Sequence, residues 1–173
     1  RGLWDVYKRQ QFGLTPYGTE AMHVLRAERG FIIVGQETDG TVSPIDLGMD
    51  WIISKKKKDF IGKRSLERAS MKQNDRKELV GLLSDDPNTV IPEGAHAIDE
   101  KDLELEEKNI LGHVTSSYFS SNCKRSIAMA LIKNGRALKG NKLVIPLLNG
   151  DKIKAKIVNP VFFDPNGVRK NGI

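Results

Sequence analysis

The chain has 173 residues, a formal net charge of +6, 39% hydrophobic residues and one cysteine, Cys123. That length suits one domain or two small ones, and no apolar run approaches the roughly 20 residues that a membrane-spanning helix needs. A lone cysteine excludes an internal disulfide and no signal-peptide pattern is visible, so we expect a reducing, cytoplasmic environment without membrane contact.

The first ten residues, RGLWDVYKRQ, follow neither a helical nor a strand period. We therefore expect residues 1–10 to be a non-native leader and leave them out of the fold prediction. They hold three basic residues and one acid, a net of +2, so the rest of the chain carries +4. This moderate positive balance suits anionic ligands and does not by itself predict nucleic-acid binding.

Residues 11–75 have the mixed pattern of an α+β domain. Thr15 and Pro16 form a typical helix start, and helical spacing of apolar residues continues to Gly30, which should end the helix. A second short helix is predicted at 62–69.

Two short apolar stretches in this region, 31–34 and 51–54, predict strands, with Trp51 in the core. The lysine run 55–58 is read as a solvated loop after a strand. Contact with a polyglutamate tail or an acidic partner subunit is the functional alternative. RNA binding is disfavoured because no aromatic residues for base stacking lie between the lysines.

Residues 76–173 change to an all-β pattern. Asn149-Gly150 is a strong hairpin signal, and the last strand alternates lysines with apolar residues, as expected for one wet and one buried face. The charged stretch 99–109 predicts a loop. Predicted strands lie at 78–83, 111–118, 126–132, 142–148 and 151–158, which favours a small antiparallel barrel or sandwich.

The residues alone reveal no catalytic centre. One cysteine and three dispersed histidines cannot form a zinc pattern, and there is no phosphate-binding glycine loop. His23 is read as a packed or surface residue, and Cys123 as a turn residue and not a nucleophile. Glu37 and Asp39 resemble a carboxylate pair, but a solvated loop is the preferred interpretation. We therefore predict no catalytic and no metal-binding residues.

Eight motifs occur in one order: LRAERG, GQETDG, SPIDLGMDW, DFIGKRSL, RKELVGLL, GHVTSSYFS, SIAMALIK and NPVFFDPNG. Together they resemble the C-terminal part of the glycine-cleavage T-protein (aminomethyltransferase) superfamily. PYGTEAMHVLRAERGF, HVTSSYFS and PVFFDPNG resemble more closely its sarcosine oxidase α-subunit branch. The resemblance implies the truncated end of an α+β folate-binding domain over 11–75 and a C-terminal β-barrel over 76–173.

The resemblance also implies a function. Tetrahydrofolate would be the cofactor, and the chain would help capture the one-carbon unit from sarcosine as 5,10-methylenetetrahydrofolate. Flavin and NAD would lie on other parts of the complex. The partners would be the remaining α-subunit residues and the other sarcosine oxidase subunits, with no nucleic acid. The isolated chain would be inactive as an oxidase.

A folate pocket needs aromatic walls, a few polar groups and a cation for the glutamate tail. By resemblance, Phe162 and Phe163 would line it, Arg169 would pair with the tail, and Tyr118 and Met22 would border it. Packing in the barrel is the alternative for the aromatic residues, and a solvated tail is the alternative for Arg169. Arg26 and Glu28 are expected to form a structural network instead.

Two departures separate the branches of the superfamily. The T-protein motif has Ala-Arg-Asp where this chain has Ala21-Met22-His23, which favours a sarcosine- or dimethylglycine-oxidising branch. The iron–sulfur repair branch has a cysteine before its GQE, which is absent here. An aminomethyltransferase or dimethylglycine dehydrogenase stays an alternative, as does a non-catalytic barrel that docks against a partner subunit.

Overall fold

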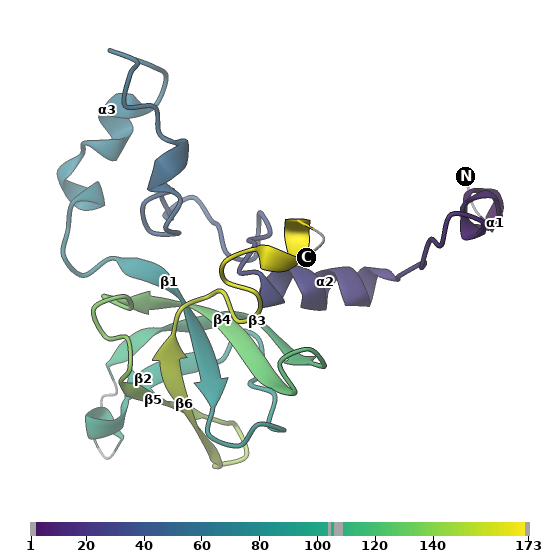
Figure 1. Ribbon diagram of the computed structural model, residues 1–173. Coiled ribbons are helices and arrows are strands. Elements are labelled where there is room, and N and C mark those ends of the chain that lie inside the picture. Colours follow the sequence, from purple (N-terminus) through teal and green to yellow (C-terminus); the bar gives the residue numbers. More distant parts are fainter. Residues whose placement is uncertain (1–2, 104, 106–108, 172–173) are drawn as a thin grey trace.

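The structure is a computed structural model that describes residues 3–103, 105 and 109–171. A β-barrel forms its body, a mainly helical and irregular region precedes the barrel, and α1 stands apart from both (Figure 1). None of the helices in these residues is long and apolar enough to cross a membrane. The elements are α1 Leu3–Gln10, α2 Thr19–Glu28, η1 Asp50–Ile52, α3 Lys63–Leu66, η2 Ala69–Met71, β1 Lys77–Ser84, β2 His96–Asp99, η3 Glu100–Asp102, β3 Ile110–Ser120, β4 Arg125–Lys133, β5 Lys142–Pro146, β6 Lys152–Val158 and η4 Val168–Asn171.

The six strands close into a barrel in the order β1-β4-β3-β2-β5-β6, and β6 returns to pair with β1. All neighbouring strands are antiparallel. The predicted hairpin is confirmed, because β5 and β6 pair from Pro146–Lys152 onward around the Asn149-Gly150 turn. Closure leaves the barrel without a free strand edge, which is how small β-domains avoid edge-to-edge association. The predicted antiparallel barrel is therefore confirmed.

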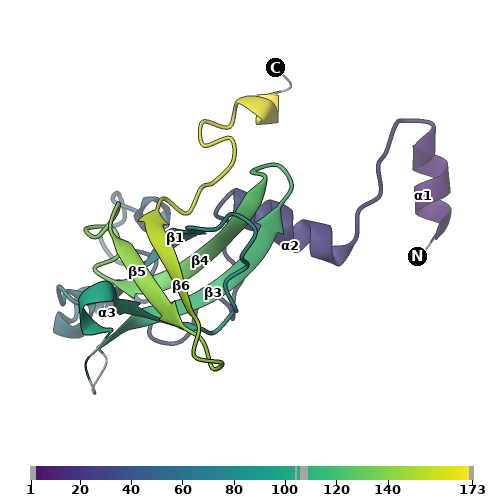
Figure 2. The same ribbon diagram turned by 90° about the horizontal axis from the view of Figure 1, so that it is seen from below.

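Strand β4 is buried on both faces, as its apolar run predicts. Ala128, Ala130 and Ile132 point into the barrel core, whereas Ile127, Met129 and Leu131 belong to a second cluster outside it. The second cluster includes Ala27 of α2 and packs that helix against the outer face of the barrel. Figure 2 shows α2 leading away from β3 and β4 toward α1.

Both short strands predicted before the barrel are wrong. Residues 31–34 contribute only an isolated bridge between Val34 and Thr38, and 51–54 begin in a 3₁₀ turn. Trp51 is 74% exposed and not in the core. The described part of the chain offers these apolar stretches no neighbouring strand, and a strand without a partner has unpaired backbone groups and is not stable alone.

Other boundaries also differ from the sequence prediction. Helix α2 begins at Thr19 and not at the predicted Thr15. It ends before Gly30, as predicted, and Gly30 has φ 68°. Residues 3–10 form a helix where no periodicity was seen. Strand β2 was not predicted, and η3 occupies the start of the expected loop 99–109, part of which lies outside the described residues.

Candidate functional site

The joint between α2 and the barrel is built around a buried ion pair. Arg26 Nη1 lies 3.0 Å from Glu37 Oε2, and these residues are 9% and 0% exposed. Arg26 also donates to Ser116 Oγ of β3 at 2.6 Å and to Gln36 Oε1 at 3.0 Å. The expected structural role of Arg26 is confirmed, but the expectation of a solvated Glu37 is wrong. A buried charge needs a partner, and Arg26 supplies it.

Glu28 connects the end of α2 to two other parts of the fold. Its buried carboxylate accepts hydrogen bonds from Ser120 Oγ at 2.6 Å and Asn122 Nδ2 at 2.8 Å. Its main-chain carbonyl accepts the backbone N–H groups of Phe162 and Phe163 at 2.9 and 3.0 Å. The predicted structural role of Glu28 is confirmed. Through Glu28 the segment that follows β6, residues 159–171, which we call the C-terminal loop, is fixed to the helix.

The C-terminal loop brings three of the predicted site residues together. The guanidinium carbon of Arg169, on η4, lies 5.0 Å from the centre of the Phe163 ring, within cation–π range. Arg29, at the end of α2, forms a 3.0 Å ion pair with Asp164 and donates to the carbonyl of Phe163. Phe162 packs against the cluster between α2 and the barrel.

Tyr118, on β3, and Met22, on α2, are not part of this group. The Tyr118 ring stacks on His23 with 6.4 Å between ring centres, and the guanidinium carbon of Arg26 lies 5.8 Å from it. Met22 is on the first half of α2 and is 44% exposed. The predicted residues therefore form two groups. Tyr118 and Met22 lie at the middle and first half of α2, whereas Phe162, Phe163 and Arg169 lie beyond the end of that helix.

A hollow of about 580 Å³ lies beneath the C-terminal loop. Phe162 and Phe163 form part of its wall, and Arg125 and Lys139 are its cations. None of its lining residues in the described part of the chain is a carboxylate, so its field favours an anionic ligand with an apolar part. Its remaining lining residues are Leu83, Asn122, Cys123, Ile127, Val158, Asn159 and Val161.

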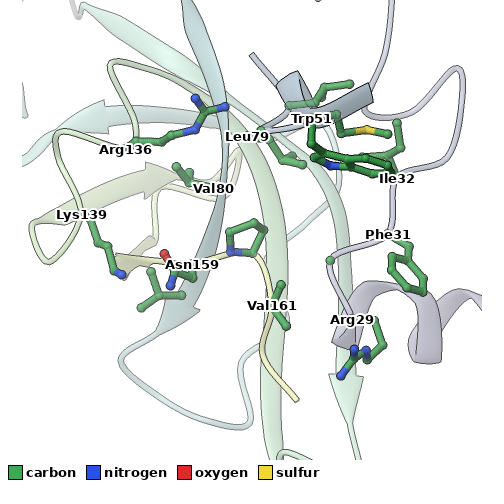
Figure 3. Close-up of a pocket in the computed structure, with 16 residues that line it drawn as sticks. Arg29, Phe31, Ile32, Trp51, Leu79, Val80, Arg136, Lys139, Asn159 and Val161 are labelled. Carbon is green, nitrogen blue, oxygen red and sulfur yellow. The ribbon is translucent and has the colours of Figure 1, made fainter. Parts of the chain in front are cut away.

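A second hollow, of about 630 Å³, lies between the segment after α2 and the barrel. Figure 3 shows Trp51 and Ile32 on one side of it, with Arg136 and Lys139 on the other. Arg136 is held by Glu78 and by the carbonyls of Ile45 and Asp46. Lys139 lines both hollows, so one cation serves two adjacent depressions.

Sequence reasoning missed the partners of Arg26 and Glu28, namely Glu37, Ser116, Ser120 and Asn122. The separations along the chain, 79 residues for Ser116 and Glu37, hide these contacts from local patterns. One signal was present, because HVTSSYFS places consecutive hydroxyl residues in a strand, and the structure buries Thr115, Ser116 and Ser117. Buried hydroxyls need hydrogen-bond partners, so this run indicated a polar contact across the barrel surface.

No three His, Cys, Asp or Glu side chains gather as a metal site within the described residues. His113 is half-buried, and burial lowers its pKa, with further lowering by the charges of Lys77 and His96. It lies beside Asp39 at a third hollow, away from the C-terminal loop. The groups that can bind a ligand are therefore the aromatic and cationic residues described above.

Comparison with known proteins gives relatives for the whole chain. The chain is 49% identical to sarcosine oxidase subunit alpha of Corynebacterium sp. (strain P-1) over 173 residues, which is 98% of this chain and 18% of that protein. It is 30% identical to an aminomethyltransferase of Thermoanaerobacter sp. (strain X514), over 95% of this chain and 42% of that protein. The chain thus spans less than a fifth of the length of the sarcosine oxidase subunit that it matches.

A solved structure has the same fold. The glycine cleavage system aminomethyltransferase T from Bartonella henselae superposes with a TM-score of 0.71 at 25% identity, covering 84% of this chain and 38% of that one. The profile described as the GCVT N-terminal domain matches residues 2–57, and the glycine cleavage T-protein C-terminal barrel domain matches residues 77–164. The resemblance predicted from the motifs is confirmed: the chain belongs to the glycine cleavage T-protein family, with sarcosine oxidase α subunits among its relatives.

Proposed function

We propose that this chain forms part of the tetrahydrofolate-binding region of a sarcosine oxidase α subunit. There it helps to capture the one-carbon unit released from sarcosine as 5,10-methylenetetrahydrofolate. The observation that carries the proposal is the 49% identity to a sarcosine oxidase subunit alpha across 98% of the chain. Flavin and NAD belong to other parts of the complex, and this chain contributes no catalytic residue to the oxidation.

The C-terminal loop supports the folate part of the proposal. Folate combines a flat aromatic pterin with an anionic glutamate tail, and such ligands need aromatic walls and a cation. Phe162 and Phe163 supply walls beside Arg125 and Lys139, and Arg169 lies against the Phe163 ring. We assign Arg169 to the glutamate tail, and Tyr118 and Met22 to the border of the pocket nearer the middle of α2.

An exposed apolar surface supports the proposed partner, the remaining residues of the α subunit. Large hydrophobic side chains that are more than 60% exposed are concentrated in the first 61 residues. Large exposed apolar side chains that are concentrated in one stretch of the chain indicate a contact with another chain segment. The examples are Tyr7, Phe12, Tyr17, Phe31, Val34 and Trp51. In the complete subunit this surface is covered, and the apolar stretches 31–34 and 51–54 gain neighbouring strands.

An aminomethyltransferase role is the second candidate, because the Bartonella henselae aminomethyltransferase shares the fold at a TM-score of 0.71. A dimethylglycine dehydrogenase role is related to it. Met22 disfavours the aminomethyltransferase, since a thioether cannot make the charged contact of the arginine in the T-protein motif. Flanking genes for the other sarcosine oxidase subunits would support our proposal, and genes for a lipoyl carrier and glycine decarboxylase would overturn it.

The direct test is a calorimetric titration of the complete, assembled subunit with tetrahydrofolate. Arg169→Ala and Phe163→Leu should each raise Kd for tetrahydrofolate by about tenfold, the size of one lost charged or aromatic contact. Matched changes at exposed sites outside the loop, Arg64→Ala and Phe119→Leu, should leave Kd within about twofold.

The same titration separates binding from a purely structural role. If the complete subunit takes up no tetrahydrofolate, or if the loop and control variants behave alike, the chain is a docking barrel and the proposal fails. The isolated 173-residue chain should show no sarcosine oxidation and only weak folate binding, because we place the flavin and part of the pocket on other residues. Turnover of sarcosine by this chain alone would contradict that assignment.

A further inference from the structure

The positive charge of the chain is concentrated in one short stretch, residues 54–72, which we call the basic segment. It contains eight Lys or Arg residues against two acids, Asp59 and Glu67, a net of +6. The formal net charge of all 173 residues is also +6. The rest of the molecule is therefore neutral overall, and the segment determines the sign of the protein's field.

The cations of the basic segment form no ion pairs within the described residues. All but Lys63 are exposed to solvent. The ion pairs that the structure contains use cations elsewhere, at Arg26, Arg29, Arg76, Arg136, Lys142 and Lys154. Among the described residues, Lys63 Nζ donates a hydrogen bond to the carbonyl of Lys58, a neutral acceptor, at 2.5 Å.

The basic segment also projects from the body of the molecule. Figure 1 shows the stretch that carries α3 standing clear of the barrel. Ile61 is fully exposed near the lysine run 55–58. The two family profiles end at residue 57 and resume at residue 77, so most of the segment lies between them.

We propose that the basic segment is a docking surface for an acidic protein face that has an apolar depression at its centre. Four adjacent lysines repel one another, and acidic side chains on a partner would relieve that repulsion. Ile61 supplies an apolar contact that a purely electrostatic encounter lacks, and apolar anchors at the centre of a polar rim are typical of protein interfaces. This surface is separate from the proposed folate pocket and does not depend on it.

The chemistry of the segment disfavours the other anionic partners. Single-stranded nucleic acids are bound by basic residues interleaved with stacking aromatics, whereas the only aromatic residue in 54–72 is Phe60, which is half-buried. Membrane surfaces are bound by long amphipathic helices or lipid anchors, whereas α3 has four residues. An acidic protein face requires neither feature.

The test measures fluorescence anisotropy of a labelled peptide of glutamates with interspersed leucines, added to the 173-residue chain. One variant changes Lys55, Lys56, Lys57 and Lys58 to Gln. Its matched control changes four exposed lysines of the barrel region, Lys101, Lys124, Lys152 and Lys156, to Gln, so both variants lose four charges. Ile61→Ser tests the apolar contact, and an all-glutamate peptide, single-stranded oligouridylate RNA and phosphatidylserine vesicles serve as comparison probes.

We expect the segment variant to bind the glutamate–leucine peptide at least about tenfold more weakly and the barrel variant to stay within about twofold. Raising NaCl from about 50 to about 200 mM should weaken wild-type binding by about tenfold, because exposed charges are screened. Ile61→Ser should weaken binding of the leucine-containing peptide only. Equal losses in both lysine variants, no peptide binding, or tighter binding of RNA or vesicles through the same lysines would each overturn the proposal.

Discussion

The main-chain carbonyl of Glu28 accepts the backbone N–H of Phe162 at 2.9 Å, and this bond attaches the C-terminal loop to the last turn of α2. The carboxylate of the same residue binds Ser120 and Asn122 at the end of β3. One buried residue therefore sets the position of the loop relative to both the helix and the barrel. The geometry of the proposed folate pocket depends on this attachment.

Replacing Glu28 with Gln should lower the free energy of unfolding by about 1–3 kcal/mol, because the new amide group faces donors and leaves a buried polar atom unpaired. The Gln side chain keeps the size of Glu, so packing is preserved. Urea unfolding followed by circular dichroism measures the change. Glu20→Gln, at an exposed position on the same helix, is the control and should change the stability by less than about 0.5 kcal/mol. Equal stability of the Glu28 variant and wild type would contradict the role of this carboxylate.

Breaking the buried pair between Arg26 and Glu37 should have a larger effect. Arg26→Met leaves the Glu37 carboxylate without its cation in a site that is 0% exposed, at a cost of about 3–5 kcal/mol. The double variant Arg26→Met with Glu37→Gln should be more stable than the Arg26 variant alone, since no unpaired charge is left. The unfolding free energies of wild type, Arg26→Met, Glu37→Gln and the double variant together give the coupling energy between Arg26 and Glu37. Additive effects would mean that the two residues do not act as a pair.

The barrel could be predicted from sequence because its signals are local. Strand β4 is a continuous apolar run, β6 alternates Lys with apolar residues, and Asn149-Gly150 marks the turn of a hairpin. Each strand finds its partners inside the chain, so the local pattern and the final fold agree. The same reasoning failed at 31–34 and 51–54, where strand-like sequence has no partner strand among the described residues.

The candidate site was predicted only in part, and for a different reason. Phe163 and Arg169 are close in sequence, and the structure brings them into contact. Tyr118 and Met22 were grouped with them by resemblance, yet they lie nearer the middle and start of α2. Glu37 was read as a loop residue because the ion pair that buries it connects residues eleven positions apart across a turn, without helical or strand periodicity. Such contacts follow from the tertiary fold and not from a local pattern.

Gly81 of β1 should not tolerate a side chain. A Cβ built there would lie 2.4 Å from the carbonyl oxygen of Asn159 and 2.8 Å from the Phe162 ring. Gly81→Ala should therefore displace the start of the C-terminal loop and destabilise the protein by about 1–3 kcal/mol, as overpacking does. Thermal unfolding measures the loss. Gly40→Ala, where a Cβ meets no atom within 4 Å, is the control, and an equal effect at both positions would refute the close-contact argument.

The pairing of Asp46 with Arg76 should give stability that is lost in acid. Burial of Asp46 works to raise its pKa, but hydrogen bonds from Arg76 and Ser43 outweigh it and hold the pKa below its usual value. As the pH falls below about 4, Asp46 is therefore protonated in the unfolded chain before it is protonated in the folded chain. The contribution is complete above that pH and disappears as the pH falls through the folded-state pKa. Urea unfolding from pH 6 to pH 3 should show a shallower acid decline in Arg76→Met than in wild type, and the same decline in both would contradict the pairing.

His113 should give a second pH dependence, closer to neutrality. Burial lowers its pKa, and the nearby charges of Lys77 and His96 lower it further. The unfolded chain therefore binds a proton below about pH 6.5 while the folded chain does not, so stability should fall as the pH decreases through that value. His113→Gln removes the titrating group and should flatten the dependence between about pH 7.5 and pH 5.5. Urea unfolding midpoints over this range measure the effect, with Gln73→Ala, at an exposed residue that does not titrate and lines the same hollow, as the control. An unchanged slope in His113→Gln would show that the imidazole is equally easy to protonate in the folded and unfolded chain.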